Sequence, residues 1–200
     1  MITSRKKIIE EAARLFIIHG YKGCRTVEVA ELAGLSNNSG LFRYFKTKKE
    51  MYRTVVERYV IKMQTPNEKF GDCSHLSLKG FIEHYVVSIG KSMVHMHALI
   101  KNGNSTANKY FSFLLESSNN YSDCSNTFFA CSDEEIKLWH KVIERAKKTG
   151  EIRPDINTYK VAKLFRYAFV GLSYSFAMEN GVTTDQIQEE LYDIYDMIKK

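Results

Sequence analysis

Apolar residues recur every three or four positions along most of the chain, which is the spacing of one face of an α-helix. No strand-like alternation runs long enough to compete with it, and Pro66 and Pro154 are the only prolines. The pattern therefore predicts an all-α fold of about nine helices. We expect them over residues 5–19, 26–33, a short segment ending near 44, 48–65, 79–101, 106–117, 133–149, 157–179 and 184–199.

Local signals mark several of these boundaries. Ser4 is placed to cap the first helix, and Gly20 and Gly34 to end the first and second. Two Ser/Thr-x-x-Glu patterns, at residues 47–50 and 132–135, are typical of capping boxes, in which side chain and backbone cap each other at a helix start. They predict helices that begin after Thr47 and after Ser132.

The first three helices have the pattern of a helix-turn-helix, in which two short helices joined by a tight turn are braced by a third. Ala30 and Ala33 are small where two helices must cross closely, and Gly34 can adopt the left-handed conformation of the turn. We expect Leu35 to fill the core between the helices. In the second helix we expect the apolar side chains to face inward, namely Val29, Ala30 and Leu32.

The positive charge of the chain lies in the same part. Residues 1–55 hold eleven Lys and Arg against five Glu, a net charge of +6, whereas the remaining residues carry equal numbers of basic and acidic side chains. This asymmetry favours one part that meets a polyanion and another that does not. A basic face that is merely solvated remains the alternative on charge alone.

Several short motifs resemble the N-terminal signature of the tetracycline-repressor (TetR) family over residues 5–60. The tail from Gly150 to Asp155 and the two helices after it are similar, more loosely, to the family's run into its dimerisation helices, whereas residues 66–130 match nothing specific. The motifs are Ala12-Ala13 with Leu15-Phe16, Gly20-Tyr21, Val29-Ala30, Ala33-Gly34-Leu35-Ser36, Leu41-Phe42-Arg43-Tyr44-Phe45 and Lys48-Lys49-Glu50.

The resemblance implies a cytoplasmic homodimer that binds a palindromic operator in double-stranded DNA and releases it when a small-molecule effector binds. It also implies a DNA-binding domain over residues 1–47 and a helical ligand-binding and dimerisation domain over 48–200. Asn38, Ser39 and Arg43 then lie on the recognition helix, while Tyr44 and Lys48 match positions that usually meet phosphates. The expected DNA-binding residues are Asn37, Asn38, Ser39, Arg43, Tyr44, Lys46 and Lys48.

Each of these assignments has a structural alternative. Asn37 and Asn38 are also typical turn formers, Tyr44 can be a core aromatic, and the lysines of 46–49 can be a solvated helix start. The chain also departs from the family pattern in two places. Cys24-Arg25 stands where a Thr/Ser pair commonly caps the second helix, and the segment from Ser36 to Phe45 is one residue longer than usual.

The expected ligand pocket consists of apolar and aromatic residues of the second domain, a lining that suits small molecules, although each can equally be core. His95 and His97 point about 200° apart on a helix, so a shared metal is not expected, and no cofactor is expected either. No catalytic motif occurs, so the chain is not expected to be an enzyme. The candidate pocket residues are Tyr85, Met93, Phe113, Phe165, Phe169 and Phe176.

The last two helices carry more apolar residues than one core needs, and we expect the surplus to form a four-helix dimer seam. A monomeric core is the alternative. The residues expected in the seam include Leu164, Ala168, Leu172, Leu191, Ile194 and Tyr195.

The expected cellular location follows from the charged residues within the apolar segments, the length of these segments and the spacing of the cysteines. Glu10, Glu11 and Arg14 break up any secretion signal, no apolar run reaches membrane-spanning length, and the four cysteines have no paired spacing, so we expect a cytoplasmic protein with free thiols and no membrane partner. The expected function is a sequence-specific transcriptional regulator, more specifically a ligand-released repressor. The alternative is a small-molecule-binding or protein-interaction module whose helix-turn-helix does not read DNA.

Overall fold

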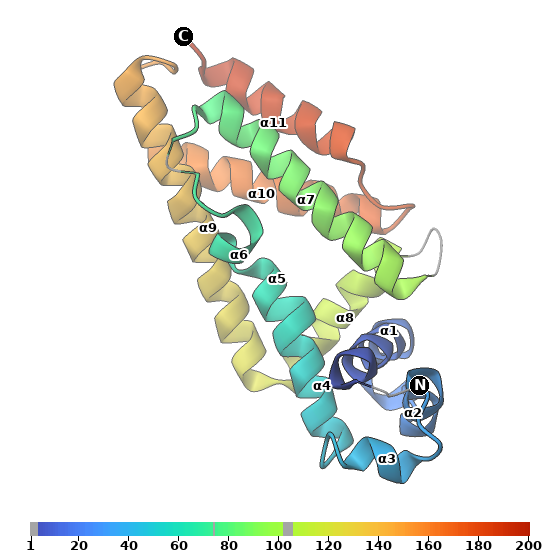
Figure 1. Cartoon of the computed structure of the whole chain (residues 1–200). Helices are drawn as coiled ribbons and strands as arrows, with labels where there is room; N and C mark the ends of the chain where they lie inside the picture. The colour runs from blue at the N-terminus through green and yellow to red at the C-terminus, as the bar shows by residue number, and fades with distance from the viewer. Residues whose placement is uncertain (1–3, 74, 102–105) are drawn as a thin grey trace. The chain divides into compact units, whose positions relative to one another are not determined.

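The computed structural model describes residues 4–73, 75–101 and 106–200 (Figure 1). These residues form helices joined by short links, and they contain no strand beyond one isolated bridge between Ile152 and Lys199. The helices are α1 (Arg5–Gly23), α2 (Thr26–Ala33), α3 (Asn38–Phe42), α4 (Lys48–Val56), the π-helical turn η1 (Glu57–Ile61), α5 (Lys62–Gln64), α6 (Pro66–Phe70), α7 (Leu78–Ile100), α8 (Thr106–Asn120), α9 (Ser122–Thr149), α10 (Thr158–Ala177) and α11 (Thr184–Ile198).

The chain divides into two compact units, each with its own core. The first unit comprises Met1–Met63 and Met96–Thr127, and the second comprises Gln64–His95 and Phe128–Lys200. This division by packing differs from the functional boundary expected between residues 47 and 48, because α4 packs on α1 within the first unit.

The first unit is built around α1, which packs against α2, α4 and α8. Ser4 caps α1 as predicted, since its Oγ accepts a hydrogen bond from the backbone N–H of Lys7 at 3.3 Å. Gly20, at φ +71°, interrupts the helical path, so the predicted stop is a kink after which three more residues complete α1. The ring of Tyr52 on α4 meets the rings of Phe16 and Phe113 edge-on, which joins α1, α4 and α8 in one core.

The predicted capping box at α4 is present with one change. The Oγ1 of Thr47 accepts from the N–H of Glu50 at 3.0 Å, but the Glu50 carboxylate accepts from the N–H of Lys46 at 2.8 Å rather than from Thr47. The box therefore fixes the link between α3 and α4, and α4 continues through η1 and α5 almost to Pro66, which opens α6.

The second unit is centred on Trp139 of α9, which is fully buried. Its ring stacks on Phe165 of α10 at 4.5 Å between centroids and meets Phe81 of α7 edge-on at 4.6 Å. α11 runs beside α7 in Figure 1, and the hydroxyl of Tyr192 on α11 donates to Glu83 of α7 at 2.9 Å. Residues of α7, α9, α10 and α11 thus form one core.

The predicted helix start after Ser132 is wrong. α9 begins at Ser122, eleven residues before the predicted start at residue 133, and Ser132 lies in its interior. Cys124 and Cys131, seven residues apart on one helical face, are both buried, so burial extends the helix beyond the local capping pattern. The predicted end at Gly150 is confirmed, since α9 stops at Thr149 and Gly150 has φ +77°.

Candidate functional site

The turn between α2 and α3 has the geometry predicted for a helix-turn-helix. Ala30 and Ala33 are buried, Gly34 adopts the left-handed conformation at φ +82°, and the N–H of Leu35 donates to the carbonyl of Ala30 at 2.8 Å. Leu35 is half-buried against the core of the first unit. Leu32, expected to face inward, is 43% exposed, because the narrow inward face of this two-turn helix is filled by Val29, Ala30 and Ala33.

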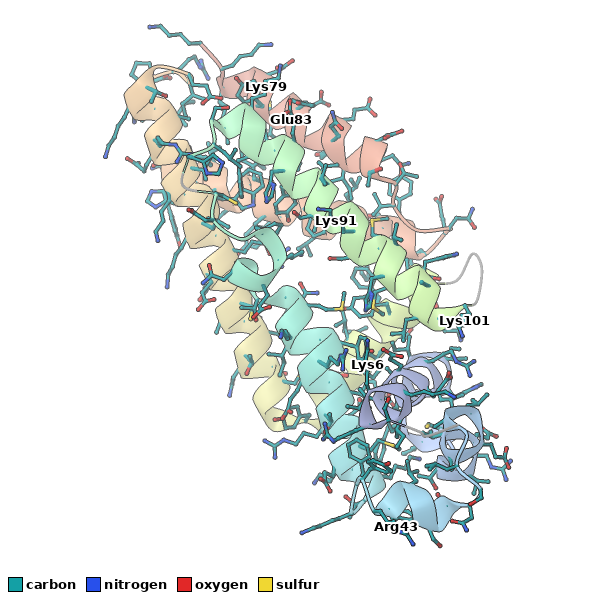
Figure 2. All side chains as sticks on the ribbon, viewed as in Figure 1. Lys6, Arg43, Lys79, Glu83, Lys91 and Lys101 are labelled. Atoms are coloured by element: carbon teal, nitrogen blue, oxygen red, sulfur yellow. The ribbon has the colours of Figure 1, made fainter. Side chains whose placement is uncertain are left out.

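The exposed face of α3 carries polar side chains at the edge of the first unit. Leu41 is the only residue of α3 that is buried, whereas Ser39 and Arg43 are exposed, and Figure 2 shows Arg43 at the outer side of this segment. Asn37 caps the helix, since its Oδ1 accepts from the N–H of Gly40 at 3.0 Å. Asn38 is half-buried, and its Oδ1 is shielded from solvent without a hydrogen-bond partner in the described part of the chain.

The three other expected DNA-binding side chains differ in their exposure to solvent. Tyr44 is 37% exposed and Lys46 is exposed, so both lie on the surface. Lys48 is half-buried, with its Nζ 3.5 Å from the carbonyl oxygen of Lys22 and 4.9 Å from the ring centroid of Tyr21. The Lys48 ammonium is therefore held beside the end of α1.

The first turn of α2 lacks a side-chain cap, where the sequence departs from the family pattern. Arg25 occupies the N-cap position and makes no side-chain cap hydrogen bond. Its guanidinium instead lies 3.6 Å from the carboxylate of Glu28, in an exposed ion pair. Backbone N–H groups in this turn consequently lack the acceptor that a Ser or Thr supplies.

A carboxylate from α8 anchors the kink that precedes this helix pair. Both oxygens of Glu116 lie 2.9 Å from the N–H of Tyr21. A Cβ added at Gly20 would meet Oε1 of Glu116 at 3.0 Å, so the carboxylate packs directly against the glycine. α8 thereby fixes where the chain leaves α1 for α2.

The residues expected to line a ligand pocket are divided between the two cores. Phe113 belongs to the core of the first unit. Tyr85 and Phe165 are fully buried in the second unit, and Met93 and Phe169 are partly buried against the same core. Phe176 on α10 is half-buried.

Sequence reasoning missed a group of buried charged and polar residues around Tyr85. The hydroxyl of Tyr85 donates to Oε1 of Glu135 at 2.6 Å, and Nε of Arg166 lies 3.4 Å from the same oxygen. Glu135 is 1% exposed and Arg166 is 4% exposed. Glu135 was interpreted as part of a helix cap, but it lies in the middle of α9. The available signal was a charged residue inside an apolar stripe, as at Arg166 between Phe165 and Phe169.

We call this group the buried charged cluster; it consists of Tyr85, Glu135, Arg166 and Lys69. Lys69, on α6, is half-buried at the margin of the cluster, with its Nζ 5.2 Å from the ring centroid of Phe70 and 5.5 Å from that of Phe169. Burial lowers the pKa of the Lys69 amine, against the opposing effect of the Glu135 carboxylate. Burial, and then the nearby Glu135 carboxylate, raise the pKa of the Tyr85 phenol well above its usual value, so Tyr85 remains a donor.

The residues expected at a dimer seam also have different environments. Leu191 and Ile194 are buried in the core of the second unit. Ala168, Leu172 and Tyr195 are partly buried, and the hydroxyl of Tyr195 donates to Glu151 at 3.3 Å. Leu164 is exposed, and it belongs to an outward apolar stripe that comprises Leu164, Tyr167, Val170 and Tyr174 of α10 and its C-cap residue Met178.

Other candidate chemistry is limited in the described residues. They contain no group of three or more His, Cys, Asp or Glu side chains arranged to hold a metal ion. The four cysteines, Cys24, Cys73, Cys124 and Cys131, are free and buried. None of the described helices is long and apolar enough to cross a membrane.

Comparisons with known proteins agree with this geometry. Residues 8–55, which contain the helix-turn-helix, match the family described as "Bacterial regulatory proteins, tetR family". No curated protein matches the sequence.

Solved structures of regulators share the fold over nearly the whole chain. A transcriptional regulator from Saccharomonospora viridis in complex with choline has a TM-score of 0.71 at 18% identity, covering 98% of this chain and 97% of that one. The ketosteroid transcriptional regulator KstR2 of Mycobacterium tuberculosis has a TM-score of 0.65 at 17% identity, covering 100% and 97%. A TetR transcriptional regulator from Chloroflexus aurantiacus has a TM-score of 0.64 at 17% identity, covering 98% and 96%. At these identities the likeness concerns the fold.

Proposed function

The N-terminal domain of this chain is that of the tetR family of bacterial regulatory proteins, and from this premise we propose that the protein is a DNA-binding repressor released by a small molecule. The observation that carries the proposal is the exposure of Ser39 on α3 and of Arg43 directly after it, in the part of the chain that holds the whole excess of positive charge. Such a helix suits the major groove, where arginine reads guanine and hydroxyls accept or donate to base edges.

Base reading and phosphate binding fall to different residues in this proposal. Ser39 and Arg43 read bases, while Tyr44, Lys46 and Lys48 meet phosphates. Asn37 contributes by shaping α3, because its side-chain oxygen is used as the cap. Asn38 is half-buried with an unused acceptor, which supports a role in which its amide turns toward a base once DNA is present.

A homodimer would present two such helices to a palindromic site. The outward stripe of α10 supports this assembly, because five large apolar side chains on one helix face are costly to leave in water. Gly171 on the same face leaves open space around its Cα, which allows a second helix to approach closely. We therefore propose a dimer seam centred on this stripe, which contains Leu164 of the residues expected from the sequence, whereas Leu191 and Ile194 lie in the core of the second unit.

The second unit would hold the effector. Its buried charged cluster supports an internal ligand site, and an excess of cationic side chains there argues against a cationic effector such as the choline of the Saccharomonospora viridis regulator. A cytoplasmic location and the absence of catalysis follow from the same proposal, since a regulator of this kind acts on DNA and catalyses no reaction.

A selection of genomic DNA fragments on the immobilised protein tests the function. We expect enrichment of a palindromic sequence with half-sites about one helical turn apart. Sedimentation at micromolar concentration should show a dimer, and Tyr167→Lys, with Lys91→Ala as an exposed control on α7, should give monomers that lose the palindrome. Recovery of no enriched sequence by the dimer would contradict the proposal.

One specific observation favours a second candidate, a ligand-binding or protein-interaction module that does not read DNA. α3 has five residues and Asn37 is engaged as its cap, so few side chains remain to read bases. The same selection separates the two candidates, because this module would enrich no site while retaining the α10 dimer.

A further inference from the structure

The buried charged cluster contains donors that the protein itself leaves unsatisfied. Nη1 of Arg166 is shielded from solvent and has no hydrogen-bond partner among the described residues, while Nε lies 3.4 Å from Oε1 of Glu135 in the ion pair without forming a hydrogen bond. Arg166 as a whole is 4% exposed. Buried guanidinium N–H groups without acceptors are rare, and each calls for an acceptor that arrives from outside the chain.

Positive charge exceeds negative charge in the cluster. Arg166 and Lys69 carry two positive charges when protonated, while Glu135 supplies one carboxylate, and Tyr85 already donates to that carboxylate. Burial lowers the pKa of the Lys69 amine; the Glu135 carboxylate opposes this effect and the Arg166 guanidinium adds to it. One further anion would complete the balance of charge.

The side chains around these cations are aromatic and belong to the second unit. Phe169 has Lys69 Nζ at 5.5 Å and the Arg166 guanidinium carbon at 5.9 Å from its ring centroid, and its ring meets Tyr85 edge-on at 5.5 Å. Ser173 lies one turn further along α10, with a buried Oγ that also lacks a partner in the described residues. Arg166, Phe169 and Ser173 are spaced i, i+3 and i+7, so they share one face of α10.

We infer that this face of α10 together with Lys69 binds the carboxylate of an aromatic organic acid. The carboxylate accepts from Nη1 of Arg166 and from Nζ of Lys69, and the aromatic body packs against Phe169 toward the hydroxyl of Ser173. The inference rests on the proposed function in one respect, namely that this acid is the effector that releases DNA. Lys69, Met93 and Phe169 are each only partly buried, whereas Tyr85 and Trp139 are fully buried, so the proposal places the entry of the acid beside the first three.

Three probes of one shape and different charge test the site. 2-Naphthoate, 2-naphthamide and 2-naphthylmethylammonium are titrated calorimetrically into the full-length protein. We expect the naphthoate to bind about 10-fold or more tightly than the amide, the factor worth one hydrogen bond with a charged group, and the ammonium to bind most weakly. Equal binding of the carboxylate and the amide, or no binding of naphthoate at millimolar concentration, would overturn the inference.

Two variants locate the preference for the anion. Arg166→Met and Lys69→Met should each remove the preference of naphthoate over naphthamide, while Lys91→Met, an exposed lysine on α7 labelled in Figure 2, should keep it. Arg166→Met can fail to fold because Glu135 loses its charged partner. In that case the double variant Glu135→Gln/Arg166→Met, which removes both charges of the ion pair, replaces it, and Lys69→Met tests the site independently. If the cluster is purely structural, these variants should lose thermal stability but keep the preference for naphthoate over naphthamide. That result would contradict the proposed binding site.

Release of the DNA recovered by selection is scored separately. Naphthoate that binds with the predicted preference but leaves the DNA complex intact supports the site and contradicts the effector role. DNA released by the amide as well as by the acid, with no difference in affinity, supports the regulator and overturns the assignment of the site to acids.

Discussion

Removing the Glu116 carboxylate should loosen the junction between α1 and α2. In the folded chain both oxygens lie 2.9 Å from the N–H of Tyr21, directly after the kink at Gly20. A hydrogen bond from an amide to a charged acceptor contributes about 1.5–3 kcal/mol, and Tyr21 is half-buried, so water replaces the lost acceptor incompletely. We therefore expect Glu116→Ala to lower the free energy of unfolding of the first unit by about 1.5–3 kcal/mol.

Hydrogen exchange measured residue by residue is the direct assay, because it reports the Tyr21 amide itself. Its protection should fall about 10- to 150-fold in Glu116→Ala, the factor that corresponds to this energy. Glu116→Gln keeps one carbonyl acceptor, so the protection of the Tyr21 amide should fall less in this variant. Asn119→Ala, which changes an exposed neighbour on α8, serves as the matched control. Equal protection of Tyr21 in Glu116→Ala and Asn119→Ala would refute the reasoning that this carboxylate holds the junction.

Three further predictions follow from the first unit. Arg43→Ala should relax discrimination between DNA sequences. Lys48→Ala should weaken binding to all DNA and reduce the slope of log affinity against log salt concentration by about one, whereas Lys148→Ala, which changes an exposed lysine, serves as the control. An unchanged slope in Lys48→Ala contradicts the phosphate contact. Arg25→Ser should stabilise α2 by about 0.5–1 kcal/mol in thermal unfolding, because it supplies the missing cap, and a lower melting temperature would show that the ion pair with Glu28 matters more. Burial raises the pKa of the Cys24 thiol from 9.0 to about 11, so the thiol of the unfolded chain ionises first as the pH rises. The contribution of this group to the free energy of unfolding is therefore complete below pH 9 and decreases by about 2–3 kcal/mol toward pH 11. Urea unfolding at several pH values should show a smaller decrease in Cys24→Ala.

Local signals in the sequence predicted the parts of the fold that local interactions decide. α2 has the predicted bounds, and Ser4, Gly34 and Thr47 act as predicted, because a cap or a left-handed turn depends on residues within a few positions. The box at Ser132 has the same local form and fails, since burial of Cys124 extends α9 through it. Local preference yields where an apolar face continues.

The environment of individual side chains depended on contacts that the sequence does not display. Glu135 is buried because Tyr85, fifty residues earlier, and Arg166, thirty-one residues later, both meet its carboxylate. The last two helices each have apolar residues on more than one face, so spacing alone could not tell the core residues Leu191 and Ile194 from the exposed Tyr167. Three-dimensional packing decides which face is left for a second chain.

The four buried thiols can report local unfolding of each unit. Cys24 and Cys124 lie in the first unit, and Cys73 and Cys131 lie in the second, all free and shielded. A thiol reagent can reach such groups only when the surrounding helices part. The order in which the two pairs are modified therefore reports which unit yields first when DNA, an organic acid or denaturant is added, without any label introduced from outside.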